Sequence, residues 1–557
     1  MKYTIFLSIL LHLIMGQLSF AQTQEDLLKG VKNSENVTNY GLGYDLQMYS
    51  PLKQINRSNI KRLVPIWSTS LSNEMGEHSQ PTVFNGVMYV VNGNWTFALD
   101  VATGHQIWRT PVQYERASLR VAGGGALMRG PATIYNGKLF RQSVDAHVMA
   151  LDLKTGKEVW NQKYADWKDG TKGVVAPMIA NGVLISGMGG SDTTARGFVD
   201  GYDPETGKRL WRTYTIPAPG EPGSETWPNS DKPDAWKTGG GSTWQSASYD
   251  PELDLVYIGT GNAEPYNPSY RNDADSLYTS SVLAIRPKTG EMVWYYQYVP
   301  NDCYDYDSTA ESVLADVTIA GKLRKVLINA HKNGFLYVLD RATGKLLAAN
   351  PYVKVSWASK IDLETGRPVL TDALERAKRG ETVEIYPSRG TNASLIAFNP
   401  HTQRVFINTW NQARVMKFVK AEYAPGAGYT GVEASFYTPP GEPLGYHKAM
   451  DPVTGKTIWS QPITQMYNSA GVLATDGGLL FTGKLSGELI ALDQNNGKTL
   501  WQFKTSSGIN APPITYTHNG RQYVSVVSGL GGSNPKRFSG DQVPSGGSVW
   551  TFALMPQ

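Results

Sequence analysis

Short apolar stretches, each leading to an acidic or basic residue and then to a Gly four positions later, recur along the chain. A Trp closes most of them. Gly104 and Gly156 are 52 residues apart, and Gly156 and Gly207 are 51 apart. The seven copies are FALDVATGHQIW (Phe97–Trp108), MALDLKTGKEVW (Met149–Trp160), DGYDPETGKRLW (Asp200–Trp211), LAIRPKTGEMVW (Leu283–Trp294), YVLDRATGKLLA (Tyr337–Ala348), KAMDPVTGKTIW (Lys448–Trp459) and IALDQNNGKTLW (Ile490–Trp501).

Each copy predicts a strand, a tight turn at the Thr-Gly, and a second strand that carries the Trp. With a further strand before each copy, a unit of about 50 residues fits one blade of a β-propeller. The segment Ile396–Ile407 reads as a degenerate eighth copy. We therefore expect an all-β, eight-bladed propeller, closed by pairing N-terminal with C-terminal strands. The Trp residues are expected to pack between blades, and the insertions Tyr214–Trp236 and Lys354–Tyr386 to form loops.

The first 21 residues differ from the rest. Lys2 precedes an apolar run, and Ser19-Phe20-Ala21 offers small residues before Gln22. This pattern predicts a secretory signal peptide over residues 1–21 and a single propeller domain over 22–557, in the periplasm or secreted. No other segment is long and apolar enough to span a membrane.

Composition narrows the functional classes. A net charge of +4 with 18% charged residues gives no basic field for nucleic acid. A single Cys excludes a disulfide framework, a Cys-based metal site and a CxxCH haem attachment.

The unrepeated segment VPNDCYDYDS (Val299–Ser308) is the strongest candidate for chemistry. Asp305 and Asp307 alternate, so on an extended segment both carboxylates would point to one face. Two carboxylates so close repel each other unless a proton or a cation intervenes, which favours a hard metal ion. A solvated acidic turn is the competing interpretation.

The repeated motif resembles the tryptophan-docking motif of the pyrroloquinoline quinone (PQQ) alcohol dehydrogenases, and the DYD segment resembles theirs as well. The resemblance implies PQQ, one metal ion and the oxidation of an alcohol to an aldehyde or ketone. It makes Asp305 the catalytic base. Asp307 stands where lanthanide-using members carry an extra carboxylate, which favours a lanthanide over calcium.

The same resemblance assigns the remaining site positions. Trp244 would be the floor on which the quinone stacks, and Lys332 the cation at the quinone oxygens. The implied metal ligands are Asp192, Asn262, Asp305 and Asp307. The implied PQQ contacts are Arg129, Gly189, Gly190, Ser191, Ser242, Trp244, Lys332 and Asn392.

Several positions depart from the family pattern. The adjacent Cys pair of the family is replaced by Gly123-Gly124, and the metal-ligand Glu by the shorter Asp192. Three further contacts of the quinone are changed, at His78, Val174 and Ser469. These changes remove bulk and polar groups around the cofactor and would widen the pocket.

The resemblance implies a small-molecule alcohol as substrate and a soluble cytochrome c as separate electron acceptor. A homodimer remains open. Two rival interpretations also stay open: a non-catalytic propeller scaffold or binding protein, and a PQQ enzyme acting on a sugar or a polymeric alcohol.

Overall fold

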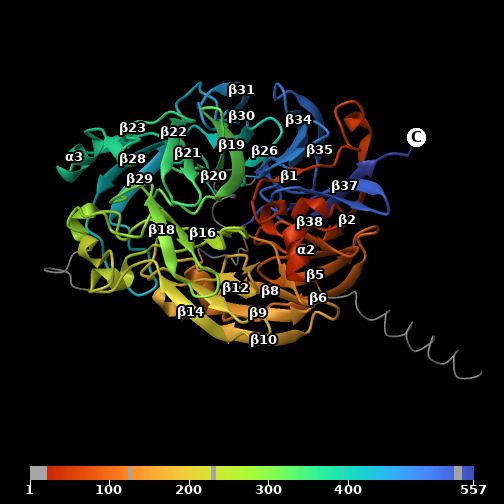
Figure 1. Cartoon of the computed structure of the whole chain (residues 1–557), viewed down its shortest axis with the longest axis horizontal. Helices are drawn as coiled ribbons and strands as arrows, with labels where there is room; N and C mark the ends of the chain where they lie inside the picture. Colours follow the sequence, from red (N-terminus) through yellow and green to blue (C-terminus); the bar gives the residue numbers. More distant parts are fainter. Residues whose placement is uncertain are drawn as a thin grey trace, which may run out of the picture.

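Strands arranged radially around a central axis form the framework of the protein (Figure 1). The computed structural model describes residues 22–122, 128, 130–227, 234–392, 394–468, 470–531 and 542–556. Within these ranges, eight sheets of four or five strands follow one another around the ring in chain order. This confirms the all-β propeller. The predicted signal peptide and the positions Gly123, Gly124, Arg129 and Ser469 lie outside the described residues.

The first five blades each consist of four consecutive strands joined by hairpins. Their bounds are β3 (Thr82–Phe84), β4 (Val87–Val91), β5 (Trp95–Asp100) and β6 (Gln106–Pro111) in blade 1; β7 (Thr133–Tyr135), β8 (Lys138–Ser143), β9 (His147–Asp152) and β10 (Glu158–Lys163) in blade 2; β11 (Met178–Ala180), β12 (Val183–Ser186), β13 (Phe198–Tyr202) and β14 (Arg209–Tyr214) in blade 3; β15 (Ser248–Asp250), β16 (Leu255–Gly259), β17 (Ser281–Ile285) and β18 (Met292–Gln297) in blade 4; and β19 (Val313–Ile319), β20 (Lys322–Ala330), β21 (Phe335–Asp340) and β22 (Leu346–Pro351) in blade 5.

The last three blades include an insertion and the ring closure. Their bounds are β26 (Ala397–Asn399), β27 (Arg404–Trp410), β30 (Gly445–Met450) and β31 (Thr457–Ile463) in blade 6; β32 (Val472–Thr475), β33 (Leu479–Gly483), β34 (Glu488–Asp493) and β35 (Thr499–Lys504), with β1 (Tyr49–Ser50) added in parallel, in blade 7; and β36 (Ile514–His518), β37 (Arg521–Ser528), β38 (Ser548–Leu554) and β2 (Leu63–Ser70) in blade 8.

The eighth blade is not the one that the repeat count indicated. The segment Ile396–Ile407 supplies β26 and part of β27, which pair with β30 and β31 of the next motif in one sheet. It is therefore the inner half of blade 6 rather than a blade of its own. Blade 8 carries no copy of the motif because its outer strand, β2, comes from the N-terminal part and pairs with β38. The expected closure of the ring by N- and C-terminal strands is confirmed.

Each motif Trp packs against the turn of the following blade, as expected for a wedge between blades. The Trp160 indole donates to Pro204 O at 3.1 Å, and a Cβ on Gly207 would lie 2.7 Å from its ring. Gly207 also has a φ of 72°, so both the close approach and the backbone require Gly. One seam differs: Ala348 replaces the Trp, and Asn350 donates to Val453 O at 3.0 Å instead.

The insertion after blade 5 is more ordered than the predicted loop. It contains a hairpin, β23 (Ala358–Ile361) and β24 (Pro368–Leu370), the helix α3 (Ala373–Lys378) and β25 (Val383–Ile385). β25 pairs with β28 (Ala413–Phe418), which pairs with β29 (Val432–Tyr437) of a second insertion inside blade 6. Alternating apolar residues in these segments account for the extra sheet. It carries Arg414 toward the site described below.

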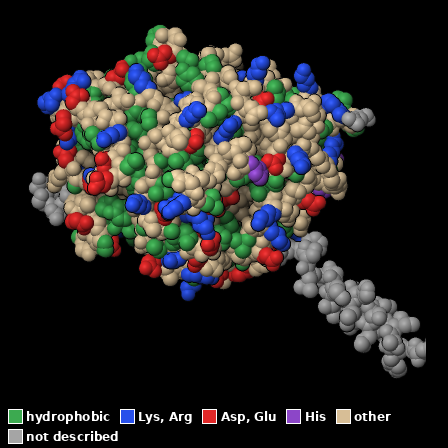
Figure 2. Space-filling view, turned by 45° about the horizontal axis from the view of Figure 1, so that its top comes forward, with side chains coloured by type: hydrophobic (Ala, Val, Ile, Leu, Met, Phe, Trp, Pro, Cys, Tyr) green, Lys and Arg blue, Asp and Glu red, His purple; other side chains and the backbone are tan. Residues whose placement is uncertain are grey.

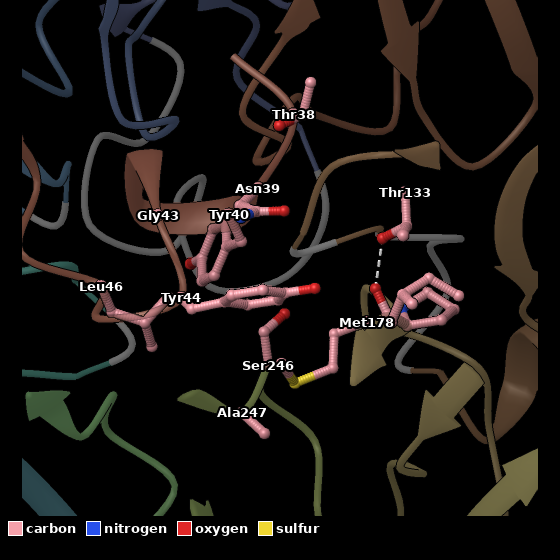
Figure 3. Close-up of a pocket in the computed structure, with 12 residues that line it drawn as sticks. Thr38, Asn39, Tyr40, Gly43, Tyr44, Leu46, Thr133, Met178, Ser246 and Ala247 are labelled. Atoms are coloured by element: carbon pink, nitrogen blue, oxygen red, sulfur yellow. Dashed lines mark hydrogen bonds between the residues drawn. The ribbon is translucent and has the colours of Figure 1, made fainter. Parts of the chain in front are cut away.

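The N-terminal part of the described chain lies near the axis. After the helix α2 (Gln24–Lys29), Tyr40 and Tyr44 lie beside Ser246 and Met178, which come from blades 4 and 3 (Figure 3). Tyr40 donates to Glu311 Oε1 at 3.0 Å. None of the helices in the described part of the chain has the length and apolar character needed to cross a membrane. On the face seen in Figure 2, acidic and basic side chains are interspersed rather than gathered into a field of one sign.

Candidate active site

Asp302 shapes the loop that carries the two predicted acids. Its carboxylate accepts hydrogen bonds from the amides of Tyr304 (2.9 Å) and Tyr306 (2.8 Å) and from Ser280 Oγ (2.9 Å). The loop therefore bends, and Asp305 has a φ of 64°, a region that non-glycine residues seldom adopt. The expected extended segment is wrong at this position. Strained backbone of this kind persists only where its surroundings hold it in place.

Lys332 brings the two acids together. Its Nζ lies 2.7 Å from Asp305 Oδ1 and 2.9 Å from Asp307 Oδ2. Burial alone would raise the pKa of Asp305, but Lys332, Arg414 and Arg389 outweigh it and lower that pKa below its usual value. Burial would lower the pKa of the Lys332 ammonium, whereas Asp305 and Asp307 raise it. Asp305 is therefore an ionised carboxylate at neutral pH.

Two arginines near Asp305 were not anticipated from the sequence. Arg414, on β28, donates to Tyr304 O at 2.6 Å and lies 3.7 Å from Asp305 Oδ2. The guanidinium groups of Arg389 and Arg414 each lie 5.6 Å from the centroid of the Phe436 ring. No motif surrounds either residue, and only the pairing of the inserted strands brings Arg414 here.

Trp244 and Asn262 meet the second acid, Asp307. The Trp244 indole donates to Asp307 Oδ1 at 3.1 Å, and the backbone N–H of Asn262 donates to the same oxygen at 3.3 Å. Trp244 is partly exposed, as stacking of a planar ligand requires. A Cβ on Gly261 would lie 2.8 Å from Asp307 Oδ1, so this approach needs Gly.

The glycines before Trp244 lie very close to other parts of the protein. A Cβ on Gly240 would lie 2.6 Å from Asn262 O, and one on Gly241 would lie 2.8 Å from Ile216 Cδ1. These glycines therefore allow close packing within the protein.

Asp192 lies within reach of the charges of both acids and accepts a hydrogen bond from the Tyr266 hydroxyl. It is solvent-accessible although protein atoms surround it closely. That desolvation, together with the charges of Asp305 and Asp307, raises the pKa of Asp192. Glu264 is a further buried acid that sequence reasoning missed, although it follows Asn262 by only two residues. Burial and the Asp192 charge raise the pKa of Glu264 well above its ordinary value.

The remaining predicted positions make the following contacts. The side chains of Ser191 and Ser242 hydrogen-bond to each other. Gly189 pairs with Lys172 through two backbone hydrogen bonds, at 2.9 and 3.0 Å, and Gly190 has a φ of 141°. Asn392 follows Gly390, whose amide donates to Lys332 O at 2.8 Å. His78 contacts Asn510, and Val174 is buried.

The donor atoms fit a hard cation. Within the described ranges, no three Asp, Glu, His or Cys side chains form a metal-binding cluster, and Lys332 pairs with both Asp305 and Asp307. Asn262 Oδ1 and Glu264 Oε2 are nevertheless buried without a hydrogen-bond partner among the described residues. Buried oxygens of this kind, beside several carboxylates, match the ligands that calcium and lanthanides prefer.

Comparisons with known proteins agree on one family. Residues 38–368 and 441–524 match the model of the glucose/ethanol/alcohol dehydrogenase β-propeller domain (PQQ). The chain is 38% identical to the quinohemoprotein alcohol dehydrogenase ADH IIB of Pseudomonas putida, over 88% of this chain and 73% of that protein. It is 35% identical to a quinoprotein ethanol dehydrogenase of Pseudomonas putida, over 96% and 92%. A solved europium-containing methanol dehydrogenase superposes with a TM-score of 0.89 at 32% identity, covering 95% of this chain and 100% of the other.

Proposed function

Because the chain belongs to the PQQ-dependent alcohol dehydrogenases, we propose that it oxidises an alcohol to an aldehyde or ketone with Asp305 as the base. The observation that carries this proposal is the placement of Asp305. It is ionised and partly exposed, and Lys332 forms ion pairs with both Asp305 and Asp307. Asp307 in turn accepts a hydrogen bond from the Trp244 indole. A positioned carboxylate that can accept the hydroxyl proton is what alcohol oxidation requires of the protein.

The residues present would hold both groups that the family uses. Asp192, Asn262, Asp305 and Asp307 would bind the metal ion. Trp244, Lys332, Ser242 and Asn392, with Arg129, Gly189, Gly190 and Ser191, would contact PQQ. When bound, PQQ supplies the two-electron oxidant, and the metal ion acts on it as a Lewis acid.

This chain's own residues would manage the proton and the charge. Asp305 accepts the proton of the substrate hydroxyl. Before this step, Lys332 and Arg414 keep the Asp305 carboxylate ionised. Lys332 is also placed to offset negative charge that develops next to it, because its ammonium is buried and held by two carboxylates. The Trp244 ring offers a planar surface that fixes the orientation of a stacked ligand.

We favour a lanthanide over calcium. Asp307 adds a carboxylate beside Asp305, and negative charge close to the ion favours a trivalent cation more than a divalent one. The likeness to a europium-containing methanol dehydrogenase supports this choice. Hydrogen bonds from Lys332, Trp244 and the Asn262 backbone N–H hold both carboxylate oxygens of Asp307 in place.

Reconstitution tests the function. The purified protein is loaded with PQQ and either calcium or lanthanum, and reduction of an artificial dye is followed with small alcohols, sugars and polymeric alcohols. We expect dye reduction with at least one small alcohol, faster with lanthanum. The absence of dye reduction with every substrate and both ions would reject the enzyme. Activity with calcium alone, unchanged in Asp307→Ala, would reject the lanthanide preference.

We also infer that residues 1–21 direct export, that residues 22–557 act as one domain, and that a soluble cytochrome c accepts the electrons. N-terminal sequencing of the protein recovered from a bacterial periplasm should begin at Gln22. An intact N-terminus would contradict the signal peptide.

Stopped-flow mixing of the reduced enzyme with cytochrome c tests the electron acceptor. A failure to reduce cytochrome c would reject that partner.

A further inference from the structure

We propose that Glu264 is an additional ligand of the metal ion, with Oε2 binding beside Asn262 Oδ1, and that it makes up for the short side chain of Asp192. The inference rests on the proposed function only in requiring that this site bind a metal ion. The other ligands follow from the family resemblance, whereas Glu264 follows from the geometry of this chain.

Glu264 is fixed next to the predicted amide ligand. It lies in the turn that follows β16, and its side chain is 1% exposed. Asn262 Nδ2 donates to Glu264 Oε1 at 3.0 Å. Because this hydrogen bond holds the side-chain nitrogen of Asn262, the side-chain oxygen Oδ1 remains available to bind a cation. Glu264 also packs against Gly240, where a Cβ would lie 3.1 Å from Glu264 Cγ.

Both remaining oxygens of this pair lack a partner among the described residues. They are Asn262 Oδ1 and Glu264 Oε2, and each is buried. A buried carbonyl or carboxylate oxygen without a hydrogen bond is costly, because it has lost its contact with water and gained no partner in exchange. The cost is removed when a cation binds both oxygens.

The charges around Glu264 also call for a cation. Asp192 and Asp305 are the acids that act on it most strongly. The cation that acts on it, Arg271, directs its guanidinium to the backbone carbonyls of Pro265 and Asp302 instead. Neighbouring carboxylates repel one another, and a proton or a metal ion relieves that repulsion.

The lengths of the side chains complement each other. Asp192 has one methylene fewer than the Glu that the family carries at its position, so its carboxylate reaches less far. Glu264 contributes a longer side chain from a different loop. With it, the site has four carboxylates, at positions 192, 264, 305 and 307. A fourth negative group favours a trivalent ion, because the attraction scales with the charge of the ion.

Terbium luminescence, sensitised by tryptophan, tests the role of Glu264 without enzymatic turnover. The full-length protein is stripped with a chelator and titrated with Tb³⁺, and Ca²⁺ is then added as competitor. Glu264→Gln keeps the shape and removes the charge. We expect it to weaken Tb³⁺ binding by about tenfold or more and Ca²⁺ binding by less. Luminescence lifetimes in H₂O and D₂O should show about one additional bound water, because water fills a lost ligand position.

Three further variants frame the result. Glu77→Gln removes another buried carboxylate that has no acidic neighbour, and it should leave Tb³⁺ affinity unchanged. Glu264→Asp keeps the charge on a shorter stem and should give an intermediate affinity; it carries the test if Glu264→Gln does not fold. Asp192→Glu added to Glu264→Gln should restore part of the lost affinity, because it returns a longer carboxylate to the site.

The proposal is overturned if Glu264→Gln binds Tb³⁺ with wild-type affinity and with the wild-type number of bound waters. An equal loss of Tb³⁺ affinity in Glu77→Gln would also overturn it. The two proposals fail separately. Terbium binding that depends on Glu264, in a protein that oxidises no alcohol, rejects the enzymatic function and keeps the ligand. Alcohol oxidation in the wild type, with unchanged Tb³⁺ binding in Glu264→Gln, rejects only the ligand.

Discussion

Glu77 and Glu264 are both buried glutamates, each with one carboxylate oxygen that has no hydrogen-bond partner in the described part of the chain. Their surroundings differ. Glu77 Oε1 accepts hydrogen bonds from Asn73 Nδ2 (2.8 Å) and Asn92 Nδ2 (3.0 Å), which are neutral donors. Burial raises the pKa of Glu77 to about 8, and the two amides lower it in part. Glu264 instead lies among acids.

The comparison teaches that burial of an acid does not by itself indicate a site. Around Glu77 the protein offers neutral amides, so a proton is sufficient to neutralise the carboxylate. Around Glu264 several carboxylates share one region with an amide oxygen, and a proton on one acid leaves the others charged. A metal ion would supply positive charge to these carboxylates and to the amide oxygen at the same time. The following experiments address each half of this contrast.

The largest effect is expected at Asp305. Asp305→Asn keeps the shape of the side chain and removes the group that accepts the proton. The turnover of alcohol by the reconstituted enzyme should fall by about 10²- to 10⁴-fold, the usual contribution of a general base. Steady-state dye reduction measures it. Glu77→Gln should retain turnover. A similar loss of turnover in both variants would mean that the loss reflects disturbed folding and not the removal of the base.

Lys332→Gln should have the next largest effect, on stability before metal is added. It leaves Asp305 and Asp307 close together without their shared cation. Removing one partner of a buried ion pair typically costs about 3–5 kcal/mol. Urea unfolding of the metal-free protein measures the loss, and added calcium or lanthanum should restore much of it. A variant that remains as stable as the wild type without metal would contradict the role of Lys332 as counterion.

Glu77 predicts a dependence of stability on pH. Burial raises the pKa of Glu77 from its ordinary value of 4.5 to about 8, so the folded state binds a proton that the unfolded state releases. Its contribution therefore falls as the pH rises from about 4.5 to 8 and is constant above that range, with a slope of about 1.4 kcal/mol per pH unit. Urea unfolding between pH 5 and 9 should show this slope in the wild type and lose it in Glu77→Gln. An equal slope in both would assign it to another group.

The sequence carries much of the fold and part of the site. The Asp, Thr-Gly and Trp of each motif predict strand, turn and seam locally, so seven blades can be recognised. Blade 8 cannot, because it pairs β2 with β38 from opposite ends of the chain. The same limit applies to the site. Asp305 and Lys332 lie in recognisable segments, whereas Arg414 arrives through the pairing of β28 with β25 and β29, which no local pattern indicates.

Glu264 shows a second limit. It is only two residues from Asn262 in the sequence, yet an acidic residue before a proline is common in exposed turns. Only the packing against Gly240 and the hydrogen bond from Asn262 turn its carboxylate inward. The direction of a side chain in a loop depends on contacts from other segments, and these contacts exist only in the folded chain.

The smallest effect is expected from Arg414→Gln, which tests whether charged neighbours rather than burial set the proton affinity in the site. Lys332, Arg414 and Arg389 lower the pKa of Asp305 against the effect of burial. Removing one of these charges should raise that pKa, so the acid limb of kcat/KM should move to higher pH by up to about one unit. The pH profile of the reconstituted enzyme measures the shift. A lower rate without a displaced limb would show that Arg414 supports the loop through its hydrogen bond to Tyr304 O and does not set the pKa of Asp305.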